Sequence, residues 1–361
     1  MAPRFRPDLE RIQPYRPGRS IADVAAEFGV DLVSKLASNE NPEPPFPEVQ
    51  SAIAAHLDGL NRYPDNARSA LTTALSDHLG VAPERIWCGG ASNELTLMTA
   101  LAMGGPDTSA VYAWPSFGLY RIGSLAVFST EIEVPLTADH RHDLPAMLEA
   151  IRGDTTIVYV CNPNNPTSTH VAGDALESFI DRIDRSVLVV VDEAYHEYAT
   201  ADDYRSMLPL AAERDNVLVT RTFSKIYSLA GLRVGYAITA AENIAELRRI
   251  QLPFSVNNLA EVAAVEALQH QDRVAARRAA NRDRIDVLTS GLRDRGCEVA
   301  ASQANFVYAS FGDATLVNEG LLERGIIVRP VYPDGWLRIN TGTPTEMERF
   351  LGALDEMGVN Q

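Results

Sequence analysis

The chain of 361 residues is longer than one average domain, and its 46% apolar and 22% charged residues are typical of a globular enzyme with a sizeable core. Its net charge of -16 at pH 7 disfavours nucleic acid and membrane surfaces as partners, because the summed field would repel both. Three widely spaced cysteines without a CxxC pattern predict neither a disulfide framework nor a metal site. The N-terminus lacks the apolar core of a signal peptide and no apolar run reaches the ~18 residues of a membrane span, so we expect a cytoplasmic protein.

The first 45 residues are rich in proline and predict an extended N-terminal arm over the body, with an amphipathic piece near Ser20–Phe28. From about Val49, helical and strand patterns alternate. The runs that predict strands are Ala110–Ala113, Thr156–Val160, Leu188–Val191, Val217–Thr220 and Gly235–Ile238. Helical segments lie between most of them, for instance 175–184, and another at 92–102 precedes the first. This alternation predicts an α/β fold with a mainly parallel sheet and helices on both faces.

After about Glu261 a long helical stretch rich in Ala and Arg runs to Arg295, and strand patterns follow at 305–309, 326–329 and 336–339. This part predicts a smaller α+β domain. We therefore expect three parts: an N-terminal arm (1–45), a large domain (46–260), and a small C-terminal domain (261–361) that the arm completes.

Polar motifs follow three of the predicted strands, at the edge where open α/β sheets bind their ligands. They read CNPNNPT at 161–167, DEAY at 192–195, and RTFSK at 221–225, which leads to GLRVGY at 231–236. Alone, each motif is compatible with a turn, a helix cap or a solvated charge. Together and in this order they are hard to explain as turns.

This combination resembles the fold-type-I aminotransferases that use pyridoxal 5′-phosphate (PLP), specifically the histidinol-phosphate aminotransferase family and its aromatic-amino-acid (phenylalanine) branch. The resemblance extends from Tyr15 to about Gly342. It implies the fold-type-I PLP transferase fold, PLP as the cofactor, a small-molecule amino donor with a 2-oxo acid acceptor, and a homodimer.

The resemblance implies a role for each motif residue. Lys225 matches the lysine that forms the Schiff base with PLP and moves the substrate's α-proton. Asp192 matches the carboxylate that keeps the pyridine nitrogen protonated. Asn162 and Tyr195 match the residues that bind the ring's phenolic oxygen. We expect Lys225, Asp192 and Tyr195 to be catalytic.

The cofactor's phosphate needs a helix N-terminus and a cation. Gly90, Ala91 and Ser92 precede a predicted helix whose free N–H groups would face it. The family's further phosphate ligands match Ser224, Arg233 and, more weakly, Thr222.

Two aromatic residues also match family positions. Phe117 matches the residue that stacks on the ring. Tyr63 resembles the tyrosine that reaches the partner subunit's cofactor phosphate, which would place the active site at a dimer interface.

Arginine binds a carboxylate with two parallel hydrogen bonds, which makes it the expected ligand of the substrate's anionic group. Arg338 matches the family's arginine for this task, and Arg329 matches a second one. Tyr15 in the arm resembles a residue that closes over the substrate, and Asn39 lies in the matching loop.

The choice of substrate within the family stays open at this point. Ser92-Asn93-Glu94 resembles the histidinol-phosphate enzymes. Phe117, the Thr167-Ser168-Thr169 extension and Phe254 resemble the aromatic branch. At the position of Phe254, histidinol-phosphate enzymes often carry a tyrosine that binds the substrate phosphate. Asn257-Asn258 and Gly90-Ala91 depart from both patterns.

The leading hypothesis is a reversible aminotransferase that acts on an aromatic or imidazole amino substrate and a 2-oxo acid such as 2-oxoglutarate. Histidinol-phosphate aminotransferase proper is an alternative. A decarboxylase, oxidase or cyclising enzyme on the same scaffold is another, because the reaction type depends on a bond angle that sequence does not show. Intact Lys225, Asp192, Asn162 and Arg338 argue against a non-catalytic domain.

Overall fold

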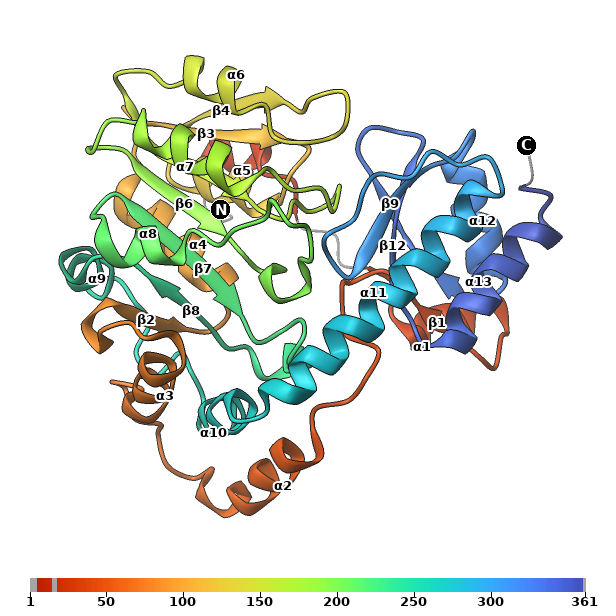
Figure 1. Ribbon diagram of the computed structural model, residues 1–361, viewed down its shortest axis with the longest axis horizontal. Helices are drawn as coiled ribbons and strands as arrows, with labels where there is room; N and C mark the ends of the chain where they lie inside the picture. The colour runs from red at the N-terminus through yellow and green to blue at the C-terminus, as the bar shows by residue number, and fades with distance from the viewer. Residues whose placement is uncertain (1–4, 15–17, 360–361) are drawn as a thin grey trace, which may run out of the picture.

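The computed structural model describes residues 5–14 and 18–359 and contains two bodies, each with its own sheet (Figure 1). The larger body holds a seven-stranded sheet in the order β2-β8-β7-β6-β5-β3-β4. Neighbouring strands are parallel except where β8 pairs with β7 and β2. The strands are β2 (Ile86–Gly89), β3 (Ser109–Trp114), β4 (Thr130–Pro135), β5 (Thr155–Cys161), β6 (Leu188–Asp192), β7 (Val217–Thr222) and β8 (Gly235–Ile238).

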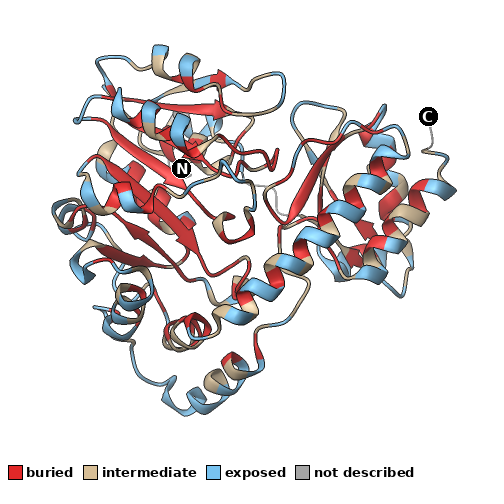
Figure 2. Ribbon diagram, in the orientation of Figure 1, coloured by how far each residue is buried: buried red, intermediate tan, exposed pale blue. Residues whose placement is uncertain are grey.

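Helices cover both faces of this sheet because its side chains alternate between two apolar cores. In β5, Val158 and Val160 belong to one core, and Ile157 and Tyr159 to the other. Figure 2 shows most of the strands buried between the two layers, while the edge strand β4 is largely not buried. The first core takes α2 (Pro47–Ala55), α3 (Ser69–Leu79), α6 (Leu144–Glu149), α7 (Gly173–Asp181), α8 (Leu208–Glu213) and α10 (Asn258–Leu268). The second takes α4 (Ser92–Met103), α5 (Leu119–Ala126) and α9 (Ala241–Leu247).

The smaller body is built on an antiparallel sheet in the order β11-β12-β9. The N-terminal segment joins it: β1 (Ser34–Lys35) pairs in parallel with β10 (Ile326–Ile327), and Val24 of α1 packs against Leu322 and Ile327. Its remaining elements are α1 (Ile21–Phe28), β9 (Phe306–Ser310), β11 (Arg329–Val331), β12 (Trp336–Asn340), α11 (Gln271–Arg293), α12 (Ala314–Glu323) and α13 (Pro344–Glu356).

The structure differs from the expected elements in four places. The strands β2 and β4 were not expected. The expected helix over 261–295 is two helices, because His270 has a non-helical backbone (φ −110°, ψ 54°) between α10 and α11. The expected strand 326–329 divides between β10 and β11, which belong to different sheets. The division at residues 45/46 and 260/261 stays a prediction.

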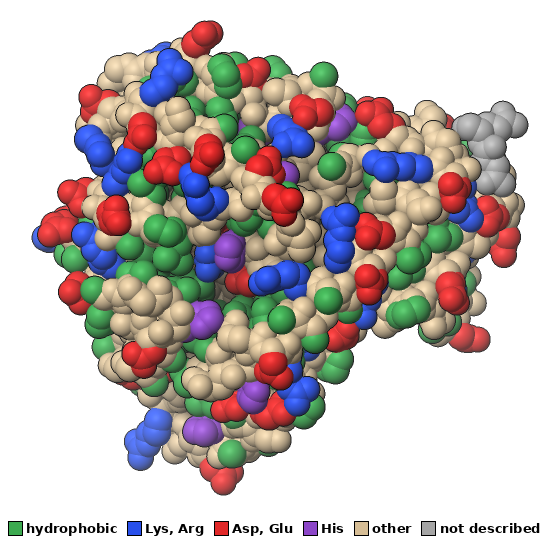
Figure 3. All heavy atoms as spheres, viewed as in Figure 1, with side chains coloured by type: hydrophobic (Ala, Val, Ile, Leu, Met, Phe, Trp, Pro, Cys, Tyr) green, Lys and Arg blue, Asp and Glu red, His purple; other side chains and the backbone are tan. Residues whose placement is uncertain are grey.

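Within residues 5–14 and 18–359, none of the helices combines the length and apolar character that a membrane span requires. On the face drawn in Figure 3, acidic and basic side chains are interleaved rather than gathered by sign.

Candidate active site

Three parallel strands end at one cavity of about 150 Å³. Cys161, Asp192 and Thr222, the last residues of β5, β6 and β7, all line it. Parallel strands bring their carboxyl ends to one edge, so the three motifs that follow them meet there. The predicted residues that line this cavity are Asn39, Ala91, Ser92, Phe117, Asp192, Tyr195, Thr222, Ser224, Lys225, Arg233 and Arg338.

The carboxylate of Asp192 forms the buried floor of the cavity. Its Oδ1 accepts hydrogen bonds from the Ala194 N–H (3.1 Å) and the Thr220 hydroxyl (3.3 Å), and its Oδ2 accepts one from the Tyr120 hydroxyl (2.9 Å). Burial raises the pKa of Asp192, and these three donors oppose that rise by stabilising the anion. The side chain is therefore an acceptor whose direction is fixed.

Lys225 is half-buried and its Nζ donates to the Asn39 carbonyl at 3.2 Å. Removal from water, followed by the Arg338 cation, lowers the pKa of Lys225 to about 8. The side-chain amide of Asn39 donates to the Tyr195 hydroxyl at 2.7 Å, and burial raises the pKa of that phenol. The N-terminal segment thus fixes both side chains in place.

The N-terminus of α4 opens onto the same cavity. Ala91 precedes the helix with a φ of 79° and gives it no side-chain cap, and Ala91, Ser92 and Asn93 line the cavity. Gly235 of β8 allows the first residue of α4 to lie close to the strand, because a Cβ at position 235 would be 2.7 Å from the Ser92 nitrogen. Gly90 itself is outside the lining, and its N–H donates to the Glu94 carboxylate (3.1 Å).

Around this helix end lie the other predicted phosphate ligands. The buried hydroxyl of Ser224 makes no hydrogen bond to the described residues. The Thr222 hydroxyl accepts a hydrogen bond from the Ser224 N–H at 3.1 Å. Arg233 supplies a cation at the exposed side. Such a set of donors fits an anion.

The smaller body contributes Arg338 from β12. Its guanidinium donates to the Asn165 side chain and to the Ala37 carbonyl, both at 2.6 Å. Arg329 of β11 lies directly across the strand pair from Arg338, and the two arginines line an adjoining cavity of about 580 Å³. Aromatic and aliphatic side chains form much of the rest of its wall, among them Trp114, Phe117, Ile122 and Tyr332.

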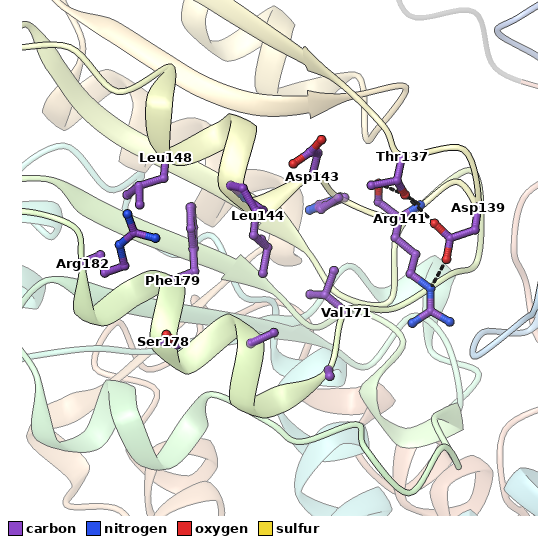
Figure 4. A pocket seen from close by; sticks show the side chains of 14 residues that line it. Thr137, Asp139, Arg141, Asp143, Leu144, Leu148, Val171, Ser178, Phe179 and Arg182 are labelled. Atoms are coloured by element: carbon purple, nitrogen blue, oxygen red, sulfur yellow. Dashed lines mark hydrogen bonds and ion pairs between the residues drawn. The ribbon is translucent and has the colours of Figure 1, made fainter.

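Asn162 follows β5 and turns its side chain toward Val171. Its Oδ1 accepts from the Val171 N–H (3.1 Å), and its Nδ2 donates to the Val171 carbonyl (3.2 Å). Val171 also lines a separate cavity of about 520 Å³ between α6 and α7, together with Leu144 and Phe179 (Figure 4). The lining of that cavity includes none of the predicted site residues.

The structure does not bring Tyr63 and Phe254 into the cavity of their own chain. Their rings stack on each other, with centroids 4.7 Å apart, and their side chains are 82% and 40% exposed. Exposed Leu57, Leu60 and Leu252 lie in the same two segments of the chain. Tyr15 lies outside the described residues.

Sequence reasoning missed several side chains that hold this site. Tyr120 and Thr220 bind Asp192, and Asn165 binds Arg338. Arg221 of β7 and Glu193, the residue after β6, also form a buried ion pair at 2.9 Å. Thr220 has the one usable signal, since it shares a strand face with Thr222; a lone tyrosine at the start of a helix carries none. Among the residues the structure describes, no cluster of His, Cys, Asp and Glu could hold a metal ion.

Residues 32–354 match the family model described as aminotransferase class I and II. A histidinol-phosphate aminotransferase from Geobacillus thermodenitrificans is 42% identical over 354 residues, which are 97% of this chain and 96% of that protein. An aromatic amino acid aminotransferase from Streptomyces avermitilis is 40% identical over 351 residues, with 97% and 96% covered. The crystal structure of a histidinol-phosphate aminotransferase from Sinorhizobium meliloti in complex with pyridoxal-5′-phosphate has a TM-score of 0.89 at 27% identity, covering 99% of this chain and 98% of that one. The chain therefore belongs to the aminotransferase class I and II family.

Proposed function

We propose that this chain is a PLP-dependent aminotransferase that exchanges the amino group of an aromatic amino acid with a 2-oxo acid such as 2-oxoglutarate. One observation carries the proposal. A lysine amine, a buried carboxylate and an uncapped helix N-terminus share a single cavity, and PLP needs one of each for its aldehyde, its ring nitrogen and its phosphate.

The residues present fit the cofactor. The Ser224 hydroxyl, buried without a partner among the described residues, and the open end of α4 suit a phosphate. Phe117 supplies a ring face, and Asp192 supplies an oriented anion for the ring nitrogen. The Tyr195 hydroxyl and the second N–H of Asn162 Nδ2 would hold the phenolic oxygen. When bound, PLP supplies a sink for the electrons released at the substrate's Cα.

Lys225 carries the proton chemistry in this proposal. With a pKa of about 8, about a tenth of the amine is neutral at pH 7, far more than for a free lysine, and this fraction is able to act as a nucleophile and a base. Arg338 binds the carboxylate of the amino acid and keeps it next to Lys225. The substrate's side chain extends into the adjoining cavity, where Trp114 and Tyr332 offer aromatic walls.

A second candidate substrate is histidinol phosphate. Arg329 lies beside Arg338 in the adjoining cavity, and two arginines suit a phosphate as well as a carboxylate. The 42% identity to a histidinol-phosphate aminotransferase supports this candidate, while Phe254, which lacks a hydroxyl, weighs against it.

We propose further that the enzyme is a cytoplasmic homodimer. Tyr63, Phe254, Leu60 and Leu252 expose large apolar side chains in two segments joined by the Tyr63–Phe254 stack, as an interface requires. In the dimer, the Tyr63 hydroxyl would reach the partner's cofactor phosphate. The three cysteines are all buried and free, which suits a reducing compartment.

A screen of amino donors in half-reactions tests the function. The purified holoenzyme is mixed in turn with phenylalanine, tyrosine, glutamate and histidinol phosphate, and its absorbance is recorded. We expect phenylalanine to replace the visible band of the lysine-bound cofactor with the ultraviolet band of pyridoxamine phosphate. A spectrum that no donor changes would overturn the assignment, and a response to histidinol phosphate alone would select the second candidate.

A further inference from the structure

Tyr120 is the feature of the site that the proposed chemistry leaves unused. It lies in the first turn of α5, three residues after Phe117, and its side chain is fully buried. Its hydroxyl donates to Asp192 Oδ2 at 2.9 Å. The other carboxylate oxygen, Oδ1, already binds the Ala194 N–H and the Thr220 hydroxyl. Among the described residues, Tyr120 alone donates to Oδ2.

The direction of this hydrogen bond follows from chemistry. An ionised carboxylate only accepts, so the phenol must donate. Burial raises the pKa of Tyr120 well above its ordinary value, so the donor proton stays in place at every physiological pH. Of the three hydrogen bonds that the Asp192 carboxylate accepts, this one is the shortest, and it opposes the rise that burial causes in the pKa of Asp192.

The ring of Tyr120 is held as firmly as its hydroxyl. It stacks on Tyr159 of β5 with centroids 4.6 Å apart and planes 10° apart. It also meets Phe117 edge to face, with centroids 5.7 Å apart and planes at 87°. One side chain therefore contacts both the aromatic ring and the carboxylate that the proposed function assigns to PLP.

We propose that Tyr120 is a positioning residue that aims the Asp192 carboxylate at the cofactor's ring nitrogen, keeps that carboxylate ionised, and supports the stacking ring of Phe117. The proposal rests on the proposed function, because it gives Asp192 a purpose only if PLP binds. Without the Tyr120 hydroxyl, Asp192 becomes a stronger base and draws the proton away from the ring nitrogen. A ring with less positive charge is a weaker electron sink.

The test compares Tyr120→Phe with Tyr159→Phe. Both changes remove one buried phenol from the same stack, but the Tyr159 hydroxyl has no hydrogen-bond partner among the described residues. The first readout is the pH midpoint at which the visible band of the lysine-bound cofactor changes. The second is kcat measured separately from KM, and thermal unfolding confirms that each variant is folded.

We expect Tyr120→Phe to raise the pH midpoint by roughly half a unit or more. With a less positive ring, the nitrogen that joins Lys225 to the cofactor holds its proton more tightly. We expect kcat to fall about tenfold, the usual effect of losing one hydrogen bond to a charge, with little change in KM. Tyr159→Phe should leave both quantities at their wild-type values. In an Asp192→Asn background, Tyr120→Phe should shift the midpoint no further.

The outcomes separate the two proposals. A wild-type protein that shows no cofactor band refutes the proposed function. If the wild type shows the band and Tyr120→Phe shares its midpoint and kcat, Tyr120 is structural only and the inference is wrong. Equal shifts in both phenylalanine variants would assign the effect to the stack and would also overturn it.

Discussion

The buried Asp192 carboxylate in the cavity and the Tyr63–Phe254 stack on the surface differ in how their surroundings hold them. At the floor, both carboxylate oxygens of Asp192 are held by buried partners within one chain. On the surface, two aromatic rings touch mainly each other and leave most of the Tyr63 side chain exposed. In the proposed enzyme, one chain would supply the cofactor's side of the site, and the surface residues would contribute only in a dimer.

The largest expected effect lies at the floor, where Lys225→Ala should abolish covalent cofactor binding and lower kcat by roughly 10⁴-fold. The chain has two lysines, and the other, Lys35, is paired with Glu40 at 3.0 Å. Borohydride reduction followed by peptide mapping should therefore label Lys225, and Lys35→Arg should leave the label and the activity intact. A label on Lys35 would contradict the assignment.

The pH dependence of cofactor attachment gives a smaller effect. Because the Lys225 pKa of about 8 lies below that of a free lysine and only the neutral amine attacks, the rate of attachment to the apo protein should rise about tenfold per unit below pH 8 and level off above it. Arg338→Gln removes a cation that lowers this pKa, so its plateau should begin at higher pH, whereas Arg338→Lys should keep the wild-type profile. Stopped-flow absorbance measures these rates; identical profiles for all three proteins would refute the coupling.

The surface stack is tested by mixing two inactive proteins. If Tyr63 serves the partner's cavity, exchanging subunits of Tyr63→Ala with Lys225→Ala should restore about a quarter of wild-type activity, because half of the dimers are mixed and each has one intact site. Two copies of the same variant provide the control. Absence of recovery, although sedimentation shows mixed dimers, would mean that Tyr63 acts within its own chain or not at all.

The smallest effect is expected at Phe254. Phe254→Tyr keeps the stack with Tyr63 and adds a hydroxyl that could donate to a substrate phosphate in the partner's cavity. We expect kcat/KM for histidinol phosphate to rise by about threefold to tenfold, which corresponds to the gain of one hydrogen bond. Turnover of phenylalanine should not change. Equal changes for both substrates would show that the position does not discriminate between them.

Part of the cavity was predictable because its residues follow strands, whereas Asn39, Phe117 and Arg338 were indicated only by the family resemblance. Asp192 and Lys225 lie in motifs that end parallel strands, and a parallel sheet collects such motifs at one edge whatever the loop details. Tyr120 was not predictable, and Asn165 was visible only as one letter of the CNPNNPT motif, because each acts through a contact with a distant element that the local sequence does not reveal. The helix break at His270 was not predictable either, because the residues around it favour a helix and no local signal marks the break.

The helix α11 has a mechanical consequence. It is 23 residues long, about 34 Å at ~1.5 Å per residue; Val274 near its start packs in a core of the larger body, and Leu288 and Leu292 near its end pack in the core of the smaller body. One stiff helix is therefore anchored in both bodies. Arg338 belongs to the smaller body and Lys225 to the larger one. If the two bodies move relative to each other, α11 must bend or pivot at its first turns, so the stiffness of this helix limits how far Lys225 and Arg338 can separate.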